Sequence, residues 1–205
     1  MHTPARLLFA FALLALSAAA HARDITVMVR DAAGHPVADA VVTLDTPGRA
    51  APPGHFVINQ KHTMFEPFVL VIPVGSTVDF ANLDPFRHHV YSFSPAKKFE
   101  LKLFGQGQKR PVTFDKPGTV ALGCNIHDTM QAFIQVVDTT FAAKTGRDGR
   151  VVLRGAPAGA AKLVVWHPYL RAPGNVMTVA AQAGGDVSLP VTVKLRRPAP
   201  MSHDY

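Results

Sequence analysis

Short runs of alternating apolar and polar residues separated by turns fill most of this chain, and this pattern restricts the fold more than any other feature. Ile25 to Val29 alternates with period two, and similar runs recur into the last third of the chain. Gly, Pro, Asn and Asp separate the runs, and apolar residues after residue 22 do not recur with helical spacing. Many short strands with regular turn signals are typical of β-sandwiches and barrels. The sequence therefore predicts an all-β sandwich, with a linker at Pro52 to Gly54. The expected strands are 25–29, 37–44, 68–74, 77–81, 88–94, 99–104, 112–114, 119–123, 133–137, 150–154, 162–166, 176–180 and 187–195.

The first 22 residues have the three regions of a secretory signal. Arg6 precedes the apolar run Leu7 to Leu16, and the small-residue triplet Ala20-His21-Ala22 matches a cleavage site. The run is shorter than the roughly 18–20 apolar residues that a membrane span requires. We therefore expect a mature protein that begins near Arg23, has no membrane span, and is soluble in the periplasm or otherwise exported.

Composition excludes several classes of protein. The 205 residues are 48% hydrophobic, which is enough to bury a core and too much for disorder throughout the chain. A single cysteine excludes an intramolecular disulfide framework, a cysteine-rich zinc site and an iron–sulfur cluster ligated only by this chain.

The net charge of +7 raises the question of a nucleic-acid partner. Residues 139–205 hold nine Lys and Arg against three Asp and Glu, so the positive excess is concentrated in the last third. These cations are spread over strand and turn patterns, with few aromatic residues between them and no nucleic-acid-binding motif. We therefore expect a solvated basic face and no nucleic-acid partner.

The segment from Cys124 to Met130 combines a thiol, the imidazole of His127 and a thioether within seven residues. Such donors suit copper far better than calcium, magnesium or manganese, which prefer oxygen, and structural zinc seldom takes a thioether. A further ligand is expected from His88 or His89, in a strand-like segment upstream. Two histidines, one cysteine and a weak axial methionine make up a blue-copper site. A nucleophilic cysteine beside a histidine is the other interpretation, but the sequence has no sign of an oxyanion hole or substrate pocket.

Residues 56–138 resemble the cupredoxins, the plastocyanin and amicyanin family of blue copper proteins. The resemblance includes Phe65 to Pro67, Val74 to Phe80, Asn82 to Asp84 and the short Cys-x-x-His-x-x-Met loop. It implies a Greek-key β-sandwich with one mononuclear type 1 copper. Two residues depart from the family pattern, since His89 replaces a frequent asparagine and Asp128 replaces the proline of amicyanin. The choice between His88 and His89 as the first ligand therefore stays open. The implied metal ligands are His88, Cys124, His127 and Met130.

The segments on either side resemble a carboxypeptidase regulatory-like, or transthyretin-like, β-sandwich. The first covers residues 25–37 and 40–44, and the second includes 145–150 and 163–166. Their order suggests a cupredoxin inserted into, or packed on, a second small sandwich, an order that resembles exported proteins labelled methylamine utilisation proteins. The expected division is a signal peptide (1–22), the first part of the flanking sandwich (23–50), the cupredoxin domain (56–138), the second part of the flanking sandwich (139–197) and a tail (198–205).

The resemblance implies a carrier of single electrons that cycles copper between Cu(II) and Cu(I) and is not an enzyme. Its expected partner is a redox protein such as a c-type cytochrome or a periplasmic dehydrogenase, and its oligomeric state is open. Two alternatives remain at this stage. One is a copper chaperone or sensor, and the other is an envelope sandwich that binds carbohydrate or protein around a structural copper site.

Overall fold

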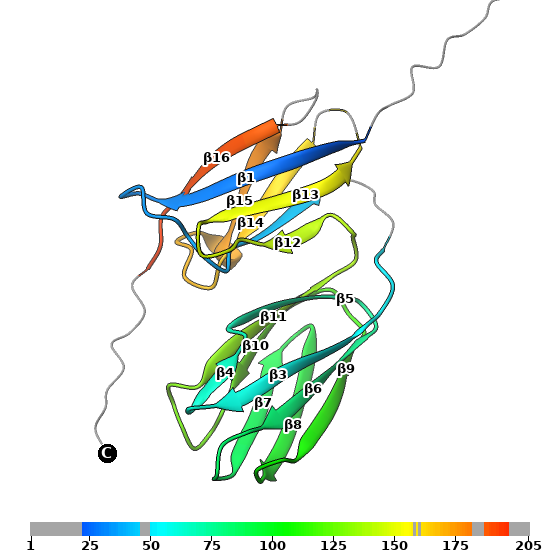
Figure 1. Cartoon of the computed structure of the whole chain (residues 1–205), viewed down its shortest axis with the longest axis vertical. Coiled ribbons are helices and arrows are strands. Elements are labelled where there is room, and N and C mark those ends of the chain that lie inside the picture. Colours follow the sequence, from blue (N-terminus) through cyan, green and yellow to red (C-terminus); the bar gives the residue numbers. More distant parts are fainter. Residues whose placement is uncertain (1–21, 46–49, 158, 160, 182–186, 197–205) are drawn as a thin grey trace, which may run out of the picture.

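Two β-sandwiches, one above the other in Figure 1, make up the computed structural model, which describes residues 22–45, 50–157, 159, 161–181 and 187–196. The predicted signal (1–22) lies almost entirely outside the described residues, as does the predicted tail (198–205). The predicted all-β sandwich is confirmed, since strands and one 3-10 turn, η1 (Pro173–Asn175), are the regular elements in the part of the chain that is described. No helix among those residues is long and apolar enough to cross a membrane.

The flanking sandwich is formed by strands from both ends of the described chain. One sheet has the order β13-β1-β16 and the other the order β12-β2-β14-β15. The first strand, β1, pairs in parallel with the last strand, β16, from Ile25 opposite Val187 onwards. The strands of this sandwich are β1 (Arg23–Asp31), β2 (Val41–Asp45), β12 (Ala142–Lys144), β13 (Arg150–Ala156), β14 (Ala161–Trp166), β15 (Val176–Ala181) and β16 (Val187–Val193).

The central sandwich is formed by the strands between β2 and β12. Its sheets have the orders β5-β11-β10-β7-β8 and β4-β3-β6-β9. The chain thus leaves the flanking sandwich after two strands and returns to it after the central one is complete, so the central sandwich is an insertion (Figure 1). Its strands are β3 (His55–Lys61), β4 (Met64–Glu66), β5 (Val69–Pro73), β6 (Ser76–Asn82), β7 (His88–Ser94), β8 (Lys97–Phe104), β9 (Lys109–Phe114), β10 (Gly118–Gly123) and β11 (Gln131–Val137).

Each sandwich has its own core, because alternate side chains of a strand point to opposite faces of the sheet. In β1, Ile25, Val27 and Val29 are fully buried between the two flanking sheets. In the central sandwich, Phe80 and Phe114 are among the largest fully buried side chains. The alternation read from the sequence therefore predicts the buried faces of both sandwiches.

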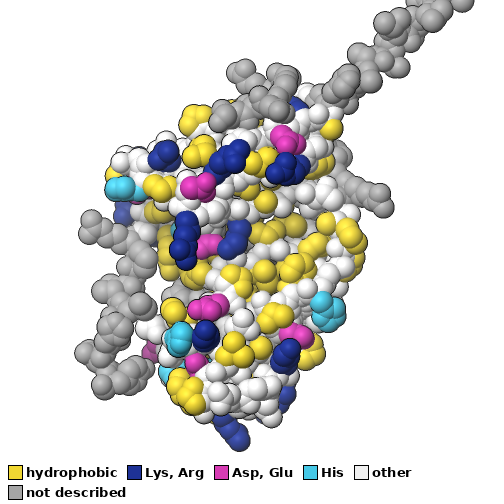
Figure 2. All heavy atoms as spheres, viewed as in Figure 1, with side chains coloured by type: hydrophobic (Ala, Val, Ile, Leu, Met, Phe, Trp, Pro, Cys, Tyr) yellow, Lys and Arg dark blue, Asp and Glu magenta, His cyan; other side chains and the backbone are white. Residues whose placement is uncertain are grey.

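A third apolar cluster joins the two sandwiches. The Trp166 ring, on the flanking β14, meets the Phe133 ring of the central β11 edge to face, with 5.6 Å between ring centroids. Tyr169 stacks on Phe68 with a centroid distance of 6.1 Å. Figure 2 shows hydrophobic side chains in a band across the middle of the visible face, between the two sandwiches. The two units are therefore packed together through aromatic side chains.

Three short or irregular strands were not expected from the sequence. In β3, Gln60 is fully buried, so a polar residue stands on the apolar face and hides the alternation. The strands β4 and β12 have three residues each, which is too short for a period-two pattern to stand out. The strand expected at 37–44 begins at Val41, because Asp39 adopts a positive φ of 58° in the preceding turn.

Candidate metal centre

Two neighbouring antiparallel strands bring the predicted ligands to one end of the central sandwich. His88 is the first residue of β7, and Cys124 directly follows β10. Because β7 and β10 run antiparallel, with Gly123 opposite Tyr91, the start of one strand lies beside the end of the other. The loop after Cys124 rejoins the sheet at Gln131, which pairs with Gly123. A seven-residue loop thus begins at Cys124 and ends at Met130.

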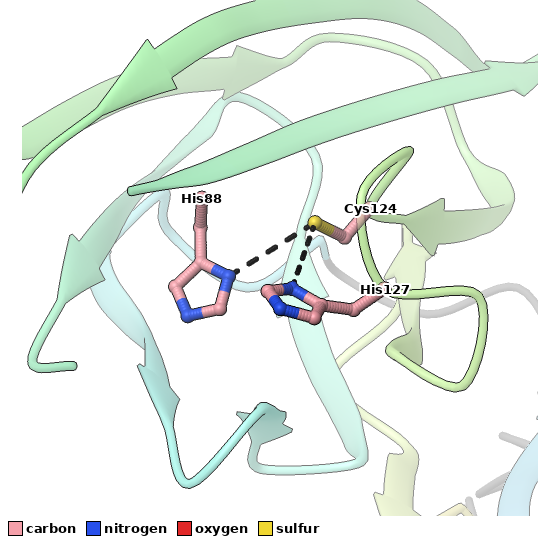
Figure 3. A group of neighbouring side chains, drawn as sticks. All are labelled: His88, Cys124 and His127. Carbon is pink, nitrogen blue, oxygen red and sulfur yellow. Dashed lines mark hydrogen bonds between the residues drawn. The ribbon is translucent and has the colours of Figure 1, made fainter. Parts of the chain in front are cut away.

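Three donor side chains converge at this point. The Cys124 Sγ lies 4.0 Å from the Nδ1 of His88 and 3.9 Å from the Nδ1 of His127. The ligand atoms of the three residues all lie within 4.8 Å of one another. In Figure 3 the imidazole rings of His88 and His127 each turn a nitrogen toward the Cys124 sulfur. This is the only such group of three or more His, Cys, Asp or Glu residues within the described ranges.

The spacing of these donors fits a single metal ion. An ion about 2.0 Å from each nitrogen and about 2.3 Å from the sulfur, in a trigonal plane, would hold each nitrogen about 3.7 Å from the sulfur. The observed separations of 3.9 and 4.0 Å are close to that value. Small rotations of the side chains therefore suffice to close the site around an ion.

Asp84 determines which nitrogen of His88 faces the sulfur. Its Oδ2 lies 2.8 Å from the Nε2 of His88, and both side chains are buried. When the Nε2–H donates to this carboxylate, the lone pair of Nδ1 is left for a metal. The contact of Asp84 with His88 was not expected from the sequence. Asp84 lies in the loop between β6 and β7, and outside a helix a separation of four residues does not predict a contact.

The backbone holds Asp84 in place. Its carboxylate accepts hydrogen bonds from the amides of His62 and Thr63, at 2.7 and 3.1 Å. Burial raises the pKa of Asp84, but the hydrogen bonds from His88 and these two amides outweigh it and lower the pKa below its usual value. The group is therefore a carboxylate, suited to accept from His88.

The amide side chain of Asn82 ties the neighbouring loop together. Its Nδ2 donates to the carbonyl oxygens of Phe86 and Phe104, and its Oδ1 accepts from the amide of Asp84. The segment that carries Asp84 to His88 is consequently anchored to β8 as well as to β6. This anchoring limits the movement of His88.

His127 is the most accessible of the three donors. It is half-buried, whereas His88 and Cys124 are buried. Burial, followed by the proximity of His88, lowers the pKa of His127, which favours the neutral imidazole that binds metals. The ring of Phe86 covers both imidazoles, with centroid distances of 5.1 Å to His88 and 5.6 Å to His127.

Met130 lies in the same loop and belongs to the same core cluster as Cys124. It is 2% exposed, and its amide donates to the His127 carbonyl oxygen at 3.0 Å, which closes the loop. Cys124 and Met130 also line a pocket of about 240 Å³ together with Tyr91 and Asp128. Met130, predicted as the axial ligand, thus shares a pocket and a core cluster with Cys124.

His89, the alternative first ligand, points elsewhere. Its Nε2 lies 2.9 Å from the Oε1 of Glu100, and its ring contacts Tyr91. The pairing of β7 with β8 is irregular between His88 and Val90, and the two adjacent histidines have different partners: Cys124 and Asp84 for His88, and Glu100 for His89. The structure places His88, and not His89, beside Cys124.

The donor set identifies the metal. One thiolate and two imidazoles, with a thioether in the same loop, are soft and borderline ligands that suit copper. The residues present therefore fit the group that the sequence predicted. The site is a mononuclear copper site.

Comparisons with known proteins give structural similarity only. No family model and no curated protein matches the chain. A Cu-containing nitrite reductase from Thermus scotoductus SA-01 is 30% identical over 54% of this chain, with a TM-score of 0.40, and the match spans 28% of the reductase. A purple cupredoxin from Nitrosopumilus maritimus is 22% identical over 40% of this chain and 98% of its own length, with a TM-score of 0.36. A variant of amicyanin is 23% identical over 47% of this chain and 98% of its own, with a TM-score of 0.38.

The nitrite reductase match corrects one expectation from the sequence. We expected that the chain is not an enzyme, because the cupredoxin resemblance implied a carrier. That expectation is wrong, because a copper-containing enzyme is among the structures to which the chain is similar. The chain spans little more than a quarter of that enzyme's length. The similar solved structures thus include copper proteins of more than one kind.

Proposed function

We propose that the central sandwich is a cupredoxin domain that exchanges single electrons with a redox partner. The observation that carries the proposal is the convergence of His88, Cys124 and His127, with their donor atoms within 4.8 Å, at the junction of two paired strands. A bound copper ion supplies one-electron exchange between its cuprous and cupric forms. His88, Cys124, His127 and Met130 are the proposed ligands.

The protein's part is to hold these ligands in place. His88 is fixed by Asp84 and by the start of β7, and Cys124 by the end of β10, so two ligands stand on paired strands. His127 and Met130 lie on one short loop that is closed by its own hydrogen bond. Ligands that move little between oxidation states keep the reorganisation small, which favours rapid electron exchange.

The surface beside His127 suits contact with another protein. Leu83, Phe86 and Ile126 are exposed by 44–45%, and Phe86 contacts the His127 ring. Large exposed apolar side chains in one area favour protein association. We propose that a c-type cytochrome or a periplasmic dehydrogenase docks here and that electrons pass through the edge of His127.

We further propose the division of the chain that the sequence suggests. A signal peptide (1–22) would direct export, and the cupredoxin domain (56–138) would interrupt a transthyretin-like sandwich formed by residues 23–50 and 139–197. An exported protein of this order would resemble the methylamine utilisation proteins. N-terminal sequencing of the secreted protein tests the cleavage site before Arg23.

The copper-loaded mature protein provides the test of function. We expect intense visible absorption from the Cys124 thiolate bound to cupric copper and reversible bleaching on reduction. Cys124→Ala and His88→Gln should each abolish the colour. His89→Gln is the matched control and should retain it, because Gln can still hydrogen-bond Glu100. A colourless copper complex of the wild type, or transfer of the copper ion itself to an acceptor in place of electrons, would contradict the proposal.

A further inference from the structure

Two segments of the flanking sandwich, joined by one isolated bridge, carry an unbalanced group of cations. Leu170 forms an antiparallel bridge with Leu195. Beside this bridge, the amide of Arg171 donates to the carbonyl of Lys194 at 2.8 Å, and the amide of Arg196 donates to the carbonyl of Tyr169 at 2.6 Å. Leu170 and Leu195 pack on the core of the sandwich. Arg171, Lys194 and Arg196, which flank the two leucines in the chain, are exposed.

These three cations surround a hollow. A pocket of about 500 Å³ is lined by the side chains of Arg171, Lys194 and Arg196 and by the turn that follows β1, which includes Asp31. This volume is within the range of small-molecule sites. The sequence predicts a solvated basic face in the last third of the chain. Three of the basic residues from that part of the chain line this one pocket.

The one acidic side chain of the pocket does not balance them. The carboxylate of Asp31 accepts hydrogen bonds from the amides of Ala33 and His35, both at 2.9 Å, and contacts the His35 ring at 3.2 Å. In the part of the chain that the structure describes, the side chains of Arg171 and Lys194 have no hydrogen-bonding or ion-pairing partner. The lining therefore has two more positive charges than negative ones.

The backbone brings two of these cations close together. The amide of Arg171 is bonded to the carbonyl of Lys194, so the two like charges are near each other and repel. Arg196 is held in place as well, because its Nη2 donates to the Oδ1 of Asn175 at 2.7 Å, and the Nδ2 of Asn175 donates to the carbonyl of Pro168. A doubly charged anion would balance the excess and remove the repulsion.

We propose that this pocket binds a phosphoryl group, either as free phosphate or at the end of a larger molecule. Two guanidinium groups present forked donors that match phosphate oxygens, and the lysine adds a third charge. The site lies in the flanking sandwich and uses no copper ligand, so the proposal is independent of electron transfer.

Calorimetric titration of the copper-loaded mature protein with inorganic phosphate at low ionic strength tests the pocket. We expect one saturable site, with affinity reduced about tenfold or more for each cation removed in Arg171→Ala and Lys194→Ala. Lys162→Ala is the control and should bind as the wild type does, because Lys162 is an exposed lysine near the start of β14 that does not line the pocket. Equal affinity in all four proteins would overturn the proposal.

Sedimentation with vesicles distinguishes the source of the phosphoryl group. Binding to phosphatidylglycerol vesicles, but not to phosphatidylcholine vesicles, that is lost in Arg171→Ala would support a lipid headgroup as the source. Phosphate binding without vesicle binding would support a soluble ligand. Failure to bind either probe would overturn the proposal.

Lys194→Glu separates binding from folding. The substitution places a carboxylate near Arg171 and so replaces a repulsion between like charges by an attraction. We expect an unfolding temperature equal to or above that of the wild type, together with loss of phosphate binding. Retained phosphate affinity in this variant would show that the anion binds elsewhere and would overturn the proposal.

Discussion

The carboxylate of Asp84 determines the tautomer and the orientation of His88, the first of the proposed histidine ligands. Asp84 is itself held by two backbone amides, so its contact with the His88 Nε2 is rigid at both ends. Such a partner fixes the tautomer and the ring orientation of a ligating histidine. Asp84 is therefore a positioning residue, although it is not one of the proposed ligands.

Asp84→Asn should weaken copper binding about 10- to 100-fold, the usual cost of losing a partner of this kind. One oxygen becomes an NH2 group, which leaves a donor facing the buried donors of this site. Competition titration with a chelator measures the affinity, and the absorption maximum reports on the ligand geometry. Asp115→Asn is the control, because Asp115 is exposed and pairs with Lys97 and not with a proposed ligand. Unchanged copper affinity in Asp84→Asn would rule out the positioning role.

His167 makes the stability of the flanking sandwich depend on pH. Burial lowers its pKa, although Asp39 acts in the opposite direction, and its Nδ1 accepts the Tyr169 amide at 3.2 Å. The unfolded chain takes up a proton near pH 6.5 and the folded one only at lower pH, so stability falls as pH decreases below about 6.5.

His167→Asn should reduce this pH dependence, because an asparagine oxygen can accept the Tyr169 amide and does not titrate. Urea unfolding of the copper-loaded wild type and variant at about pH 7 and about pH 5 measures the difference. We expect the wild type to lose more stability than the variant over this interval. Parallel losses in the two proteins would show that His167 is not responsible.

The sequence predicts the ligands that share a loop better than those that do not. Cys124, His127 and Met130 are brought together by seven consecutive residues, so their spacing alone places them in one site. The choice of His88 over His89 depends on the local irregularity at the start of β7, which the sequence of two adjacent histidines does not reveal. The contact of Asp84 with His88 depends on the path of the loop between β6 and β7, which no periodic sequence pattern predicts.

At the scale of elements, β10 carries the cysteine to its place and depends on close packing with β7. The ring of Tyr91 covers Gly123, and a Cβ added at Gly123 would lie 2.7 Å from this ring. Only glycine allows this approach one residue before Cys124. The end of β10 is thus held against β7 by an aromatic contact in addition to the strand pairing.

Gly123→Ala should destabilise the protein by about 1–3 kcal/mol, the typical cost of overpacking, and should broaden or shift the copper absorption because Cys124 follows directly. Gly105→Ala is the matched control, since an added Cβ there meets no atom within 4 Å. Chemical unfolding and the visible spectrum provide the two measurements. A Gly123→Ala protein as stable as the control, with an unchanged spectrum, would contradict this account of β10.

Sequence patterning predicts the strands that have one apolar and one polar face, and it fails where a polar side chain is buried. Period-two patterning predicts β7 with its bounds and most other strands within a few residues. It misses β3, where Gln60 is buried with no hydrogen-bond partner for its amide among the described residues. A polar side chain inside the core removes the contrast that such patterning needs.

At the scale of the whole molecule, the aromatic contact between the sandwiches decides whether they unfold together. Trp166 is 6% exposed and packs on Phe133, three residues after Met130 in the chain. Nothing in the sequence distinguishes these residues from ordinary sandwich core residues, so the packing of the two units could not be predicted. The order of the segments suggested only that one sandwich is inserted into, or packed on, the other.

Trp166→Ala should cost about 3–5 kcal/mol, as for other large aromatic truncations, and should separate the unfolding of the two sandwiches. Calorimetry of the copper-loaded protein, with the visible band as a reporter of the central sandwich, measures this. We expect the wild type to unfold in one transition and the variant in two. Phe93→Ala, at a residue 78% exposed, is the control. A single transition in Trp166→Ala at the wild-type temperature would contradict the coupling.

The parallel pairing of β1 with β16 also determines how the molecule bears a mechanical load. A force that pulls the two chain ends apart acts on the strands nearest to them, which are neighbours in one sheet of the flanking sandwich. The central sandwich is joined to the flanking one by two connections, one after β2 and one before β12. Tension applied between the two ends would therefore shear the β1–β16 pair first and would reach the proposed copper ligands only after the flanking sheet had separated.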